Sequence, residues 1–368
     1  NKNVFFGYYD INPISKRGDK ILAMVTSKIK HKNSLAKIGY YFINNANEFH
    51  VIDSTDLWCW QQGCRLRWSI IHNHIYYNKK ISNKYCSVLQ NIEDKSTVKI
   101  FDRAFYDISR DEKFGLSLNF SRLERLRKGY GYSLLPDSTI NQYAPKDDGI
   151  FLVNLKKNTN KLIIPVSKIA KINPNNTMDK AAHYFNHLSF NKAGNRFLFF
   201  HLWNKNNKRY SRLFSSNLDG SDIFLIEGNE IVSHYDWLDD KNICLTTYSK
   251  ENGLTYNIFK DKSKLKKTLN KKLLNEDGHP TFHPKDKNLI LSDTYPDKFS
   301  KRKLFVYNIL DDSKYIIGEY SSNIFYEKDY RCDLHPRWSD DGNYVSFDSS
   351  HTGVRTLNVI NFENYIHT

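Results

Sequence analysis

The sequence predicts an all-β fold, a seven-bladed β-propeller, and three observations support it. A strand–turn–strand signature recurs seven times along the 368 residues, and most copies start about 43 to 56 residues apart, close to the length of a four-stranded blade. The chain contains 24 Tyr and 23 Phe, side chains that suit a pleated, half-buried surface. Apolar patterns of helical period are scarce. We therefore expect a single propeller domain over residues 1–368.

The repeated signature is a short strand, a polar turn with Gly or Asp, and a second strand of alternating large residues, which is hairpin chemistry. Its best copies are LSFNKAGNRFLFF from Leu188, PTFHPKDKNLILSDT from Pro280 and PRWSDDGNYVSFDS from Pro336. Weaker copies begin at Asn12, Leu66, Asp107 and Tyr235. Further hairpins with Asp-Gly or Asp-Asp turns follow from Arg212 and from Lys303, where outer strands of blades are expected.

The gap between the third and fourth signatures is longer than the others, about 80 residues, where a blade needs roughly half that length. We therefore predict an insertion between blades 3 and 4 over residues 121–177. Within it, Ser121 to Arg127 is the best candidate for a short helix.

The net charge of +15 suits a polyanionic partner, whether nucleic acid, acidic polysaccharide or an anionic membrane surface, but charge alone favours a merely solvated surface. The densest basic run, Lys260 to Lys272, is expected to be an exposed loop or edge. No apolar run is long enough for a membrane helix, so no membrane span is expected.

Cysteine usage and the chain start bear on the compartment. Five cysteines form an odd set without Cys-x-x-Cys spacing, which favours a reducing compartment over a disulfide framework. They are Cys59, Cys64, Cys86, Cys244 and Cys332. Because the chain begins at Asn1, we expect a leader or an upstream domain to be missing. Localisation and oligomeric state stay open.

Histidines recur at one phase of the repeat, just before the signatures. In a propeller the loops that precede the inner strands surround the central channel, the usual place for a ligand. We therefore expect the histidines to converge on the axis, where they suit metal binding or acid–base chemistry. They are His187, His234, His279 and His335. Other polar residues expected to contact a ligand there are Tyr8, Tyr9, Asp10, Gln62, His201 and Arg331.

Two stretches, SDTYPD from Ser292 and FDSSHTG from Phe347, place an aspartate after a signature strand. We expect these aspartates to close turns or brace blades rather than to catalyse. The sequence contains no Gly-x-Ser-x-Gly, phosphate-binding loop, dinucleotide-binding glycine pattern or His-Glu-x-x-His, which disfavours serine hydrolysis and nucleotide chemistry.

The repeats and the order of the polar motifs resemble oligogalacturonate lyases and the wider group of Tol-type, WD40-like propellers. The most specific stretches are FFHLWNKNNKRYSRLFSSNLDGSD from Phe199, then IVSHYDW, EDGHPTFHP and RCDLHPRWSDDG. The resemblance implies a lyase that removes the proton beside a uronate carboxylate, helped by a divalent metal, usually manganese. It also implies catalytic roles for Arg212 and His234, and metal binding by His279 and His335.

The chain departs from the family at one motif. Where the family reads Gln-x-x-His-x-His, this sequence reads Cys332-Asp-Leu-His335-Pro-Arg337. Cys332 is then the candidate third metal ligand. Arginine stays protonated and cannot bind a metal, but it pairs well with carboxylates. Arg337 and Arg212 are therefore alternatives to the metal for holding the substrate carboxylate.

The first functional hypothesis is a lyase that cleaves a uronic-acid-containing glycan by β-elimination. His234 is the expected base, and Tyr235, Tyr8 or Tyr9 the expected proton donor. A glycoside hydrolase is the second hypothesis and needs a carboxylate pair from Asp10, Asp236 and Asp333. A third is a non-catalytic propeller that binds glycan or protein as a module of a larger surface-polysaccharide protein. Nucleic acid is not an expected partner.

Overall fold

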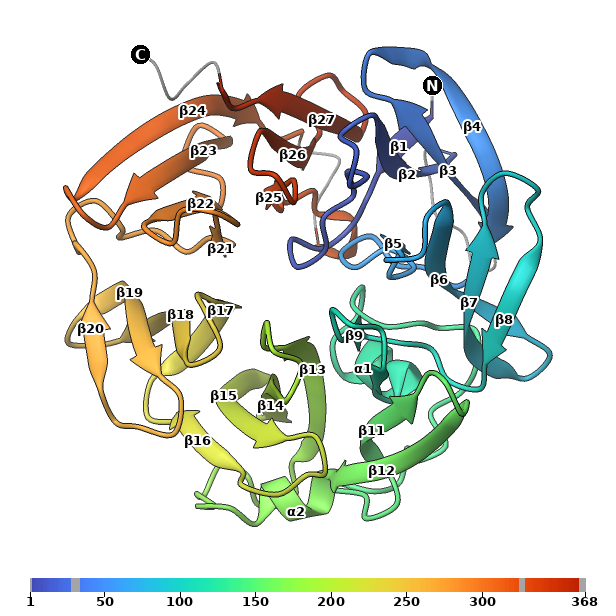
Figure 1. Cartoon of the computed structure of the whole chain (residues 1–368). Coiled ribbons are helices and arrows are strands. Elements are labelled where there is room, and N and C mark those ends of the chain that lie inside the picture. Colours follow the sequence, from blue (N-terminus) through green and yellow to red (C-terminus); the bar gives the residue numbers. More distant parts are fainter. Residues whose placement is uncertain (1, 28–33, 324–327, 364–368) are drawn as a thin grey trace.

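The computed structural model describes residues 2–27, 34–323 and 328–363. Seven antiparallel sheets stand around a central axis like the blades of a fan (Figure 1). Six sheets have four strands and the last has three. In each sheet the strands are ordered along the chain, and the signature supplies the strands nearest the axis. The predicted all-β, seven-bladed propeller is therefore confirmed.

The first three blades take up the N-terminal half of the chain. Blade 1 contains β1 (Asn3–Phe5), β2 (Lys20–Thr26), β3 (Ala36–Phe42) and β4 (Asn45–Thr55). Blade 2 contains β5 (Arg67–Trp68), β6 (His74–Ile81), β7 (Lys84–Asn91) and β8 (Thr97–Phe101). Blade 3 contains β9 (Asp107–Ile108), β10 (Phe114–Ser117), β11 (Gly149–Asn154) and β12 (Thr159–Pro165).

The remaining four blades complete the ring. Blade 4 contains β13 (Ala182–Phe190), β14 (Arg196–Lys205), β15 (Lys208–Asn217) and β16 (Phe224–Glu227). Blade 5 contains β17 (Ile231–Trp237), β18 (Asn242–Ser249), β19 (Gly253–Lys260) and β20 (Lys266–Thr268). Blade 6 contains β21 (Thr281–Phe282), β22 (Leu289–Asp293), β23 (Lys301–Asn308) and β24 (Ser313–Ser321). Blade 7 contains β25 (Arg337–Trp338), β26 (Tyr344–Ser349) and β27 (Thr356–Asn361).

The turn residues of the signatures close the inner hairpins as predicted. In blade 7 the Ser339 hydroxyl donates to the Asp341 carboxylate at 2.5 Å, and the Gly342 amide donates to the Ser339 carbonyl at 3.0 Å. Such short side chains stabilise a turn by bonding their own backbone. Both outer hairpins expected from Arg212 and Lys303 are also present, as β15–β16 and β23–β24.

The predicted insertion over residues 121–177 is not confirmed as a segment between blades. That range contains β11 and β12, which are the third and fourth strands of blade 3 itself. The extra length lies partly between β10 and β11, where helix α1 (Phe120–Leu126) forms, and partly after β12, where α2 (Val166–Ala170) forms. The long excursion separates the two halves of blade 3, so its outer strands did not stand out in the sequence.

Helix α1 confirms the predicted short helix and begins at a side-chain cap. The Asn119 side chain accepts a hydrogen bond from the Arg122 amide at 2.9 Å, which satisfies one of the free amides at a helix start. Arg122 is itself buried and donates to five acceptors, among them the carbonyls of His183 and Tyr143. This arginine therefore attaches the excursion to blade 4.

The ring closes where the first and last blades meet. The Val4 amide donates to the Arg355 carbonyl at 2.9 Å, and the Phe6 amide donates to the Asp348 carboxylate at 3.2 Å. In Figure 1 the blue first blade accordingly lies beside the red seventh blade. In the part of the chain that the structure describes, no helix is long and apolar enough to cross a membrane.

Candidate active site on the propeller axis

Four histidines from four successive blades meet at the centre of the ring. His187 in β13 and His234 in β17 sit where the register of their strands shifts, and bulges of this kind re-aim a side chain. His279 and His335 lie in the loops just before β21 and β25. All four are buried. The convergence expected from the phase of the repeat is therefore present.

Ring contacts link these histidines to one another and to the two tyrosines of the loop after β1. The His279 ring centroid lies 4.1 Å from that of His234 and 4.4 Å from that of His335. Tyr8 lies 4.9 Å from His335 and 5.1 Å from His187, and Tyr9 lies 5.1 Å from His279. We call these six residues the axial cluster.

Two glycines allow the backbone to approach closely enough to build the cluster. Gly7 adopts a φ of +138°, and a Cβ there would lie 2.9 Å from the Gln62 carbonyl carbon. A Cβ on Gly278 would lie 1.9 Å from the Asp293 carbonyl oxygen. Any larger residue would displace the loops, so the Gly-Tyr-Tyr and Asp-Gly-His motifs require glycine to bring Tyr8 and His279 to the axis.

Asp293 and Asp348, the aspartates expected to brace blades, hold these loops. One oxygen of Asp293 accepts from the His279 amide and from its Nδ1, both at 2.8 Å, and the other accepts from the His335 amide at 3.3 Å. Asp348 accepts from the amides of Phe6 and Gly7. Each aspartate therefore fixes ligand-bearing loops without itself facing the centre of the cluster.

The hydrogen bonds determine which ring nitrogen of His335 carries its proton. His335 Nδ1 bonds the Gly7 carbonyl at 2.9 Å, so this nitrogen carries the proton, and the buried Nε2 has no hydrogen-bond partner. Burial lowers the pKa of His335 well below its usual value, so the ring stays neutral. A carbonyl or carboxylate that orients one ring nitrogen is typical of metal-binding histidines.

Asp333 completes a group that suits a divalent cation. Donor atoms of His279, Asp333 and His335 all lie within 4.8 Å of one another. Burial raises the pKa of Asp333, but Arg331 and Arg302 outweigh it and hold that pKa well below its usual range, so the side chain is a carboxylate. Two imidazoles and one carboxylate fit manganese or a similar metal, and the unpartnered His335 Nε2 supports that fit.

Cys332, the expected third ligand, does not belong to this group among the described residues. Burial raises the pKa of its thiol to about 11, and a protonated thiol is a poor metal ligand. Asp333, the next residue, offers the carboxylate instead. The sequence motif was therefore read one residue too early, because alternation between inward and outward positions was not known for this loop.

The Asp277 carboxylate orients the imidazole of His234. Its Nδ1 lies 3.2 Å from the Asp277 carboxylate, which leaves Nε2 for a ligand. Burial lowers the pKa of His234, with His279 adding to the effect. Burial alone would raise the pKa of Asp277, but His234 and Ser233 bring it down to about 2. The pair is therefore a neutral imidazole oriented by a carboxylate.

The three tyrosines expected to donate a proton differ in their contacts. Tyr235 stacks on His187 at 4.2 Å, and its hydroxyl donates to the His187 carbonyl. The Tyr9 hydroxyl donates to the Tyr235 carbonyl at 3.0 Å. The Tyr8 hydroxyl has no hydrogen-bond partner in residues 2–27, 34–323 and 328–363, and burial raises the pKa of Tyr8 well above its usual value. Tyr8 is therefore protonated, and it is the one of the three tyrosines whose hydroxyl is not hydrogen-bonded to another described residue.

A group of arginines and tyrosines lies beside the axial cluster, and we call it the mouth. It contains Arg127, Tyr130, Tyr295 and Arg331. Arg331 is 30% exposed, donates to Asp333 at 2.7 Å, and lies 5.3 Å from the centroid of Tyr295. The guanidinium of Arg127 lies 3.8 Å over the ring of Tyr130, whose hydroxyl accepts from Arg331 at 3.3 Å. The sequence analysis expected only Arg331 here. Arg127 and Tyr130 come from the sequence Arg127-Lys128-Gly129-Tyr130 after helix α1.

Arg209 belongs to the same mouth. Arg209 is exposed, and the positive charge of Arg127 lowers its pKa. Two arginines that repel each other gain stability when an anion lies between them. The mouth is therefore suited to an acidic ligand.

Two arginines predicted for the site have backbone partners instead. Arg337 donates to the carbonyls of Gly7 and Tyr8 and pairs with Asp348 at 3.5 Å, so it holds the tyrosine loop. Arg212 donates to the carbonyls of Ile169, Ile172 and Asn173 and to His201. Among the described residues no hydrogen bond or ion pair joins Arg212 to the axial cluster. These contacts favour structural roles for both.

Four further residues predicted for the site are hydrogen-bonded to other parts of the protein. His201 contacts Arg212 and His183 inside blade 4. Gln62 donates to the Tyr106 hydroxyl at 2.7 Å. Asp10 is held by both terminal nitrogens of Arg65. Burial raises the pKa of Asp236 to about 6, but the side chain accepts from the Phe282 amide. The carboxylates that a glycoside hydrolase would need are therefore bound to other groups.

Comparison with known proteins supports the propeller fold, but it does not show which reaction the protein catalyses. No known sequence family matches this chain, and no curated protein sequence does. An oligogalacturonate lyase in complex with manganese is 12% identical over 100% of this chain and 92% of its own, with a TM-score of 0.72. The oligogalacturonate lyase of Vibrio parahaemolyticus is 12% identical over 98% and 91%, with a TM-score of 0.70. The tricorn protease is 10% identical over 99% of this chain and 34% of its own, with a TM-score of 0.57. The expected resemblance is therefore confirmed for the propeller fold.

Proposed function

We propose that this protein is a lyase that cleaves a uronic-acid-containing glycan by β-elimination at the axial cluster. The observation that carries the proposal is the combination, in one place, of a neutral base, a possible cation site and a basic mouth. The similar fold of two oligogalacturonate lyases supports the same chemistry, although fold alone does not determine function.

The reaction needs three groups. A base removes the proton beside the uronate carboxylate, a carbon–carbon double bond forms, and the bond to the leaving sugar oxygen breaks as that oxygen gains a proton. His234, oriented by Asp277, is the proposed base. Tyr8, whose hydroxyl is unengaged, is the proposed proton donor. Its ring lies 6.2 Å from that of His279, which in turn lies 4.1 Å from the ring of His234.

The acidity of the substrate proton depends on neutralising the carboxylate beside it. His279, Asp333 and His335 would hold a manganese-like cation, and such a cation, when bound, supplies this neutralisation. Arg331 lies against the same group through Asp333. Its Nε and Nη2 already bind Asp333 and Tyr130, so we propose that its remaining nitrogen and its positive charge attract the carboxylate of the substrate.

A direct assay tests the proposal. The protein is incubated with manganese and with oligomers and polymers of galacturonate, and the absorbance of the unsaturated uronate product is followed in the ultraviolet. We expect product with the wild type, less after chelation, and at least about a hundredfold slower formation with His234→Ala. Absence of product from every uronate-containing glycan tried would reject the lyase. Tight glycan binding without turnover would instead support the non-catalytic binding module.

A further inference from the structure

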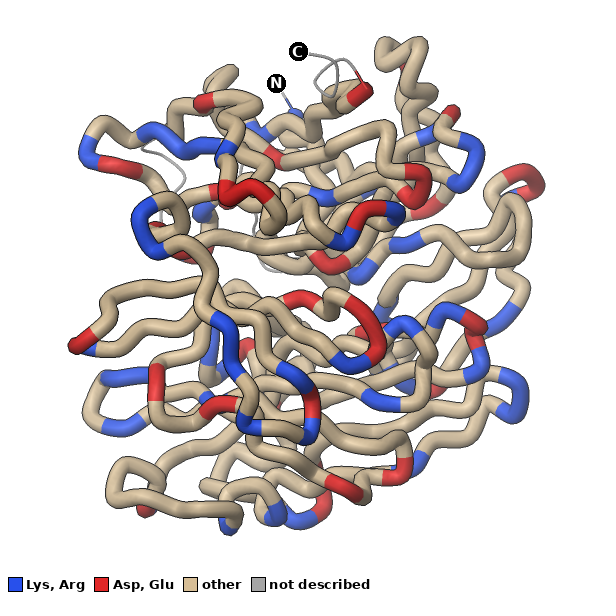
Figure 2. Tube along the Cα trace, turned by 60° about the vertical axis from the view of Figure 1, so that its left-hand side comes forward, with Lys and Arg blue, Asp and Glu red and all other residues tan. Residues whose placement is uncertain are grey.

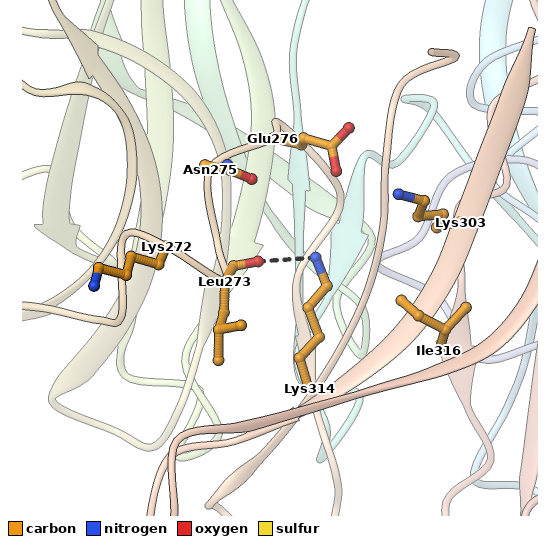
Figure 3. Close-up of a pocket in the computed structure, with 7 residues that line it drawn as sticks. All are labelled: Lys272, Leu273, Asn275, Glu276, Lys303, Lys314 and Ile316. Atoms are coloured by element: carbon orange, nitrogen blue, oxygen red, sulfur yellow. Dashed lines mark hydrogen bonds between the residues drawn. The ribbon is translucent and has the colours of Figure 1, made fainter. Parts of the chain in front are cut away.

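A surface groove lies between blades 5 and 6, outside the axial cluster. It has a volume of about 490 Å³ and is formed by the connection from β20 to β21 on one side and by β23 and β24 on the other. Lys272, Leu273 and Glu276 come from the connection, and Lys303, Lys314 and Ile316 come from the strands (Figure 3). Three lysines and one glutamate thus line a single depression, with Lys303 and Lys314 on the side of Glu276 and the Lys272 side chain directed away from them (Figure 3).

One lysine of the groove is already partly removed from water. Lys314 donates to the Leu273 carbonyl at 2.9 Å (Figure 3) and lies 4.1 Å over the ring of Phe305. Burial lowers the pKa of Lys314, Glu276 acts against this, and Lys303 lowers it further. The positive charges of Lys303 and Lys314 therefore repel each other at close range, and a bound anion would relieve the repulsion.

The groove continues a basic strip along the rim of blade 5. The run from Lys260 to Lys272 was predicted to be an exposed loop or edge, and it contains β20, whose three residues are all exposed. Lys266 pairs with Glu230 and Lys262 pairs with Asp222, whereas Lys267 and Lys272 have no ion pair in the described part of the chain. Figure 2, with blades 5 and 6 turned forward, shows several basic stretches on this side.

Chain continuity connects the groove to the axial site at two points. Glu276 is followed directly by Asp277, which orients His234. Lys303 and Thr294 exchange two hydrogen bonds, each 3.0 Å long, and Thr294 is followed by Tyr295 of the mouth. The groove is therefore joined to residues of the axial site by one step along the chain at Glu276–Asp277 and by one strand pairing at Thr294–Lys303.

The lining favours an acidic glycan over nucleic acid. Binding of single-stranded nucleic acid relies on aromatic platforms and arginine, on which bases stack. The groove presents no aromatic ring or arginine among its lining residues. Lysine ammonium groups are point charges that suit isolated carboxylates, and the carbonyl and amide groups beside them suit sugar hydroxyls.

We propose that this groove is a second binding site, for the uronate carboxylates of an acidic polysaccharide, next to the site that cleaves it. This inference rests on the proposed function for the class of substrate. A polymer held at two neighbouring places binds more tightly than either place alone allows, because the second contact is intramolecular. The groove would therefore favour long chains over short ones.

The test uses Lys272→Glu/Lys303→Glu and a matched control, Lys156→Glu/Lys157→Glu, which makes the same charge change on the exposed outer turn of blade 3. Binding of polygalacturonate and of digalacturonate is measured by calorimetry in a His234→Ala background, so that turnover does not interfere. Circular dichroism checks that each variant is folded. We expect the groove variant to bind the polymer at least about fivefold more weakly and the dimer unchanged.

Three results would overturn the groove proposal. They are equal losses in the groove and control variants, equal binding of fully methyl-esterified polymer, and equal binding of single-stranded DNA at the same ionic strength. Failure of the lyase proposal looks different, because wild-type protein would then bind polygalacturonate through the groove without forming unsaturated product. The two proposals therefore fail separately.

Discussion

Two groups of buried histidines differ in their hydrogen bonding. One is the pair His183 and His201 inside blade 4, and the other is the axial cluster. In blade 4, Arg212 donates to His201, His201 bonds His183 at 2.9 Å, and His183 bonds the Met178 carbonyl. Every ring nitrogen of that pair has a partner. On the axis, the Nε2 atoms of His187 and His335 are buried and have no hydrogen-bond partner within residues 2–27, 34–323 and 328–363.

The difference separates a structural histidine from a functional one. A satisfied buried imidazole stabilises the fold, because each polar atom has replaced its water. An unsatisfied buried nitrogen costs free energy and persists where a ligand or metal completes it. His183 and His187 occur in the same five-residue motif, so only their surroundings distinguish the two roles.

The largest effect is expected from removing an axial nitrogen. His279→Ala should abolish stabilisation by manganese and lower turnover of oligogalacturonate by about a thousandfold or more, because the cation would no longer offset the substrate carboxylate. Thermal unfolding with and without manganese and the ultraviolet assay measure the two effects. His183→Ala, in the other cluster, should keep its response to manganese. An unchanged response in His279→Ala would contradict the cation site.

Removal of the proposed base should be the next largest effect. His234→Ala should lower turnover by about 10²- to 10⁴-fold, the usual contribution of a positioned base. Its melting temperature should still rise with manganese, because His279, Asp333 and His335 remain. Turnover within a factor of two of wild type would remove His234 from the mechanism.

We expect Arg212 to stabilise the fold and not to take part in the reaction. Arg212→Met leaves three backbone carbonyls and His201 without their donor, so we expect the free energy of unfolding to fall by about 3 kcal/mol. Turnover per folded molecule should change little. Chemical denaturation and the ultraviolet assay distinguish this outcome from a hundredfold loss of turnover at full stability, which would restore the catalytic role implied by the resemblance.

The smallest effect concerns the pH dependence of stability. Burial lowers the pKa of His183 to about 4, so the folded protein binds fewer protons there than the unfolded chain. This contribution is complete above the unfolded pKa, about 6.5, and is lost as pH falls from there towards about 4. In His183→Gln the free energy of unfolding should depend less steeply on pH across that window, by up to about 1.4 kcal/mol per pH unit. Identical slopes would show that His183 is protonated when folded.

The positions of the axial residues could be predicted from the sequence more accurately than the role of each residue. It identified the four histidines because each precedes a repeat, and the repeat fixes their radial position. It chose Cys332 over Asp333, since the irregular loop before β25 offers no alternation from which direction can be inferred. It expected Arg212 and Arg337 to be free for a ligand, and both have backbone partners that lie far away in the sequence.

The sequence by itself determined the number of blades, the hairpin turns and the phase that brings histidines to the axis, because these depend on local periodicity and turn chemistry. Only the tertiary structure decided which polar atoms are satisfied. The Nδ1 of His335 meets the carbonyl of Gly7, and Arg127 of the blade 3 excursion reaches a mouth shared with Arg331 of the loop before blade 7. Such long-range partners determine whether a buried polar group stabilises the fold or keeps an atom without a partner that can bind a ligand.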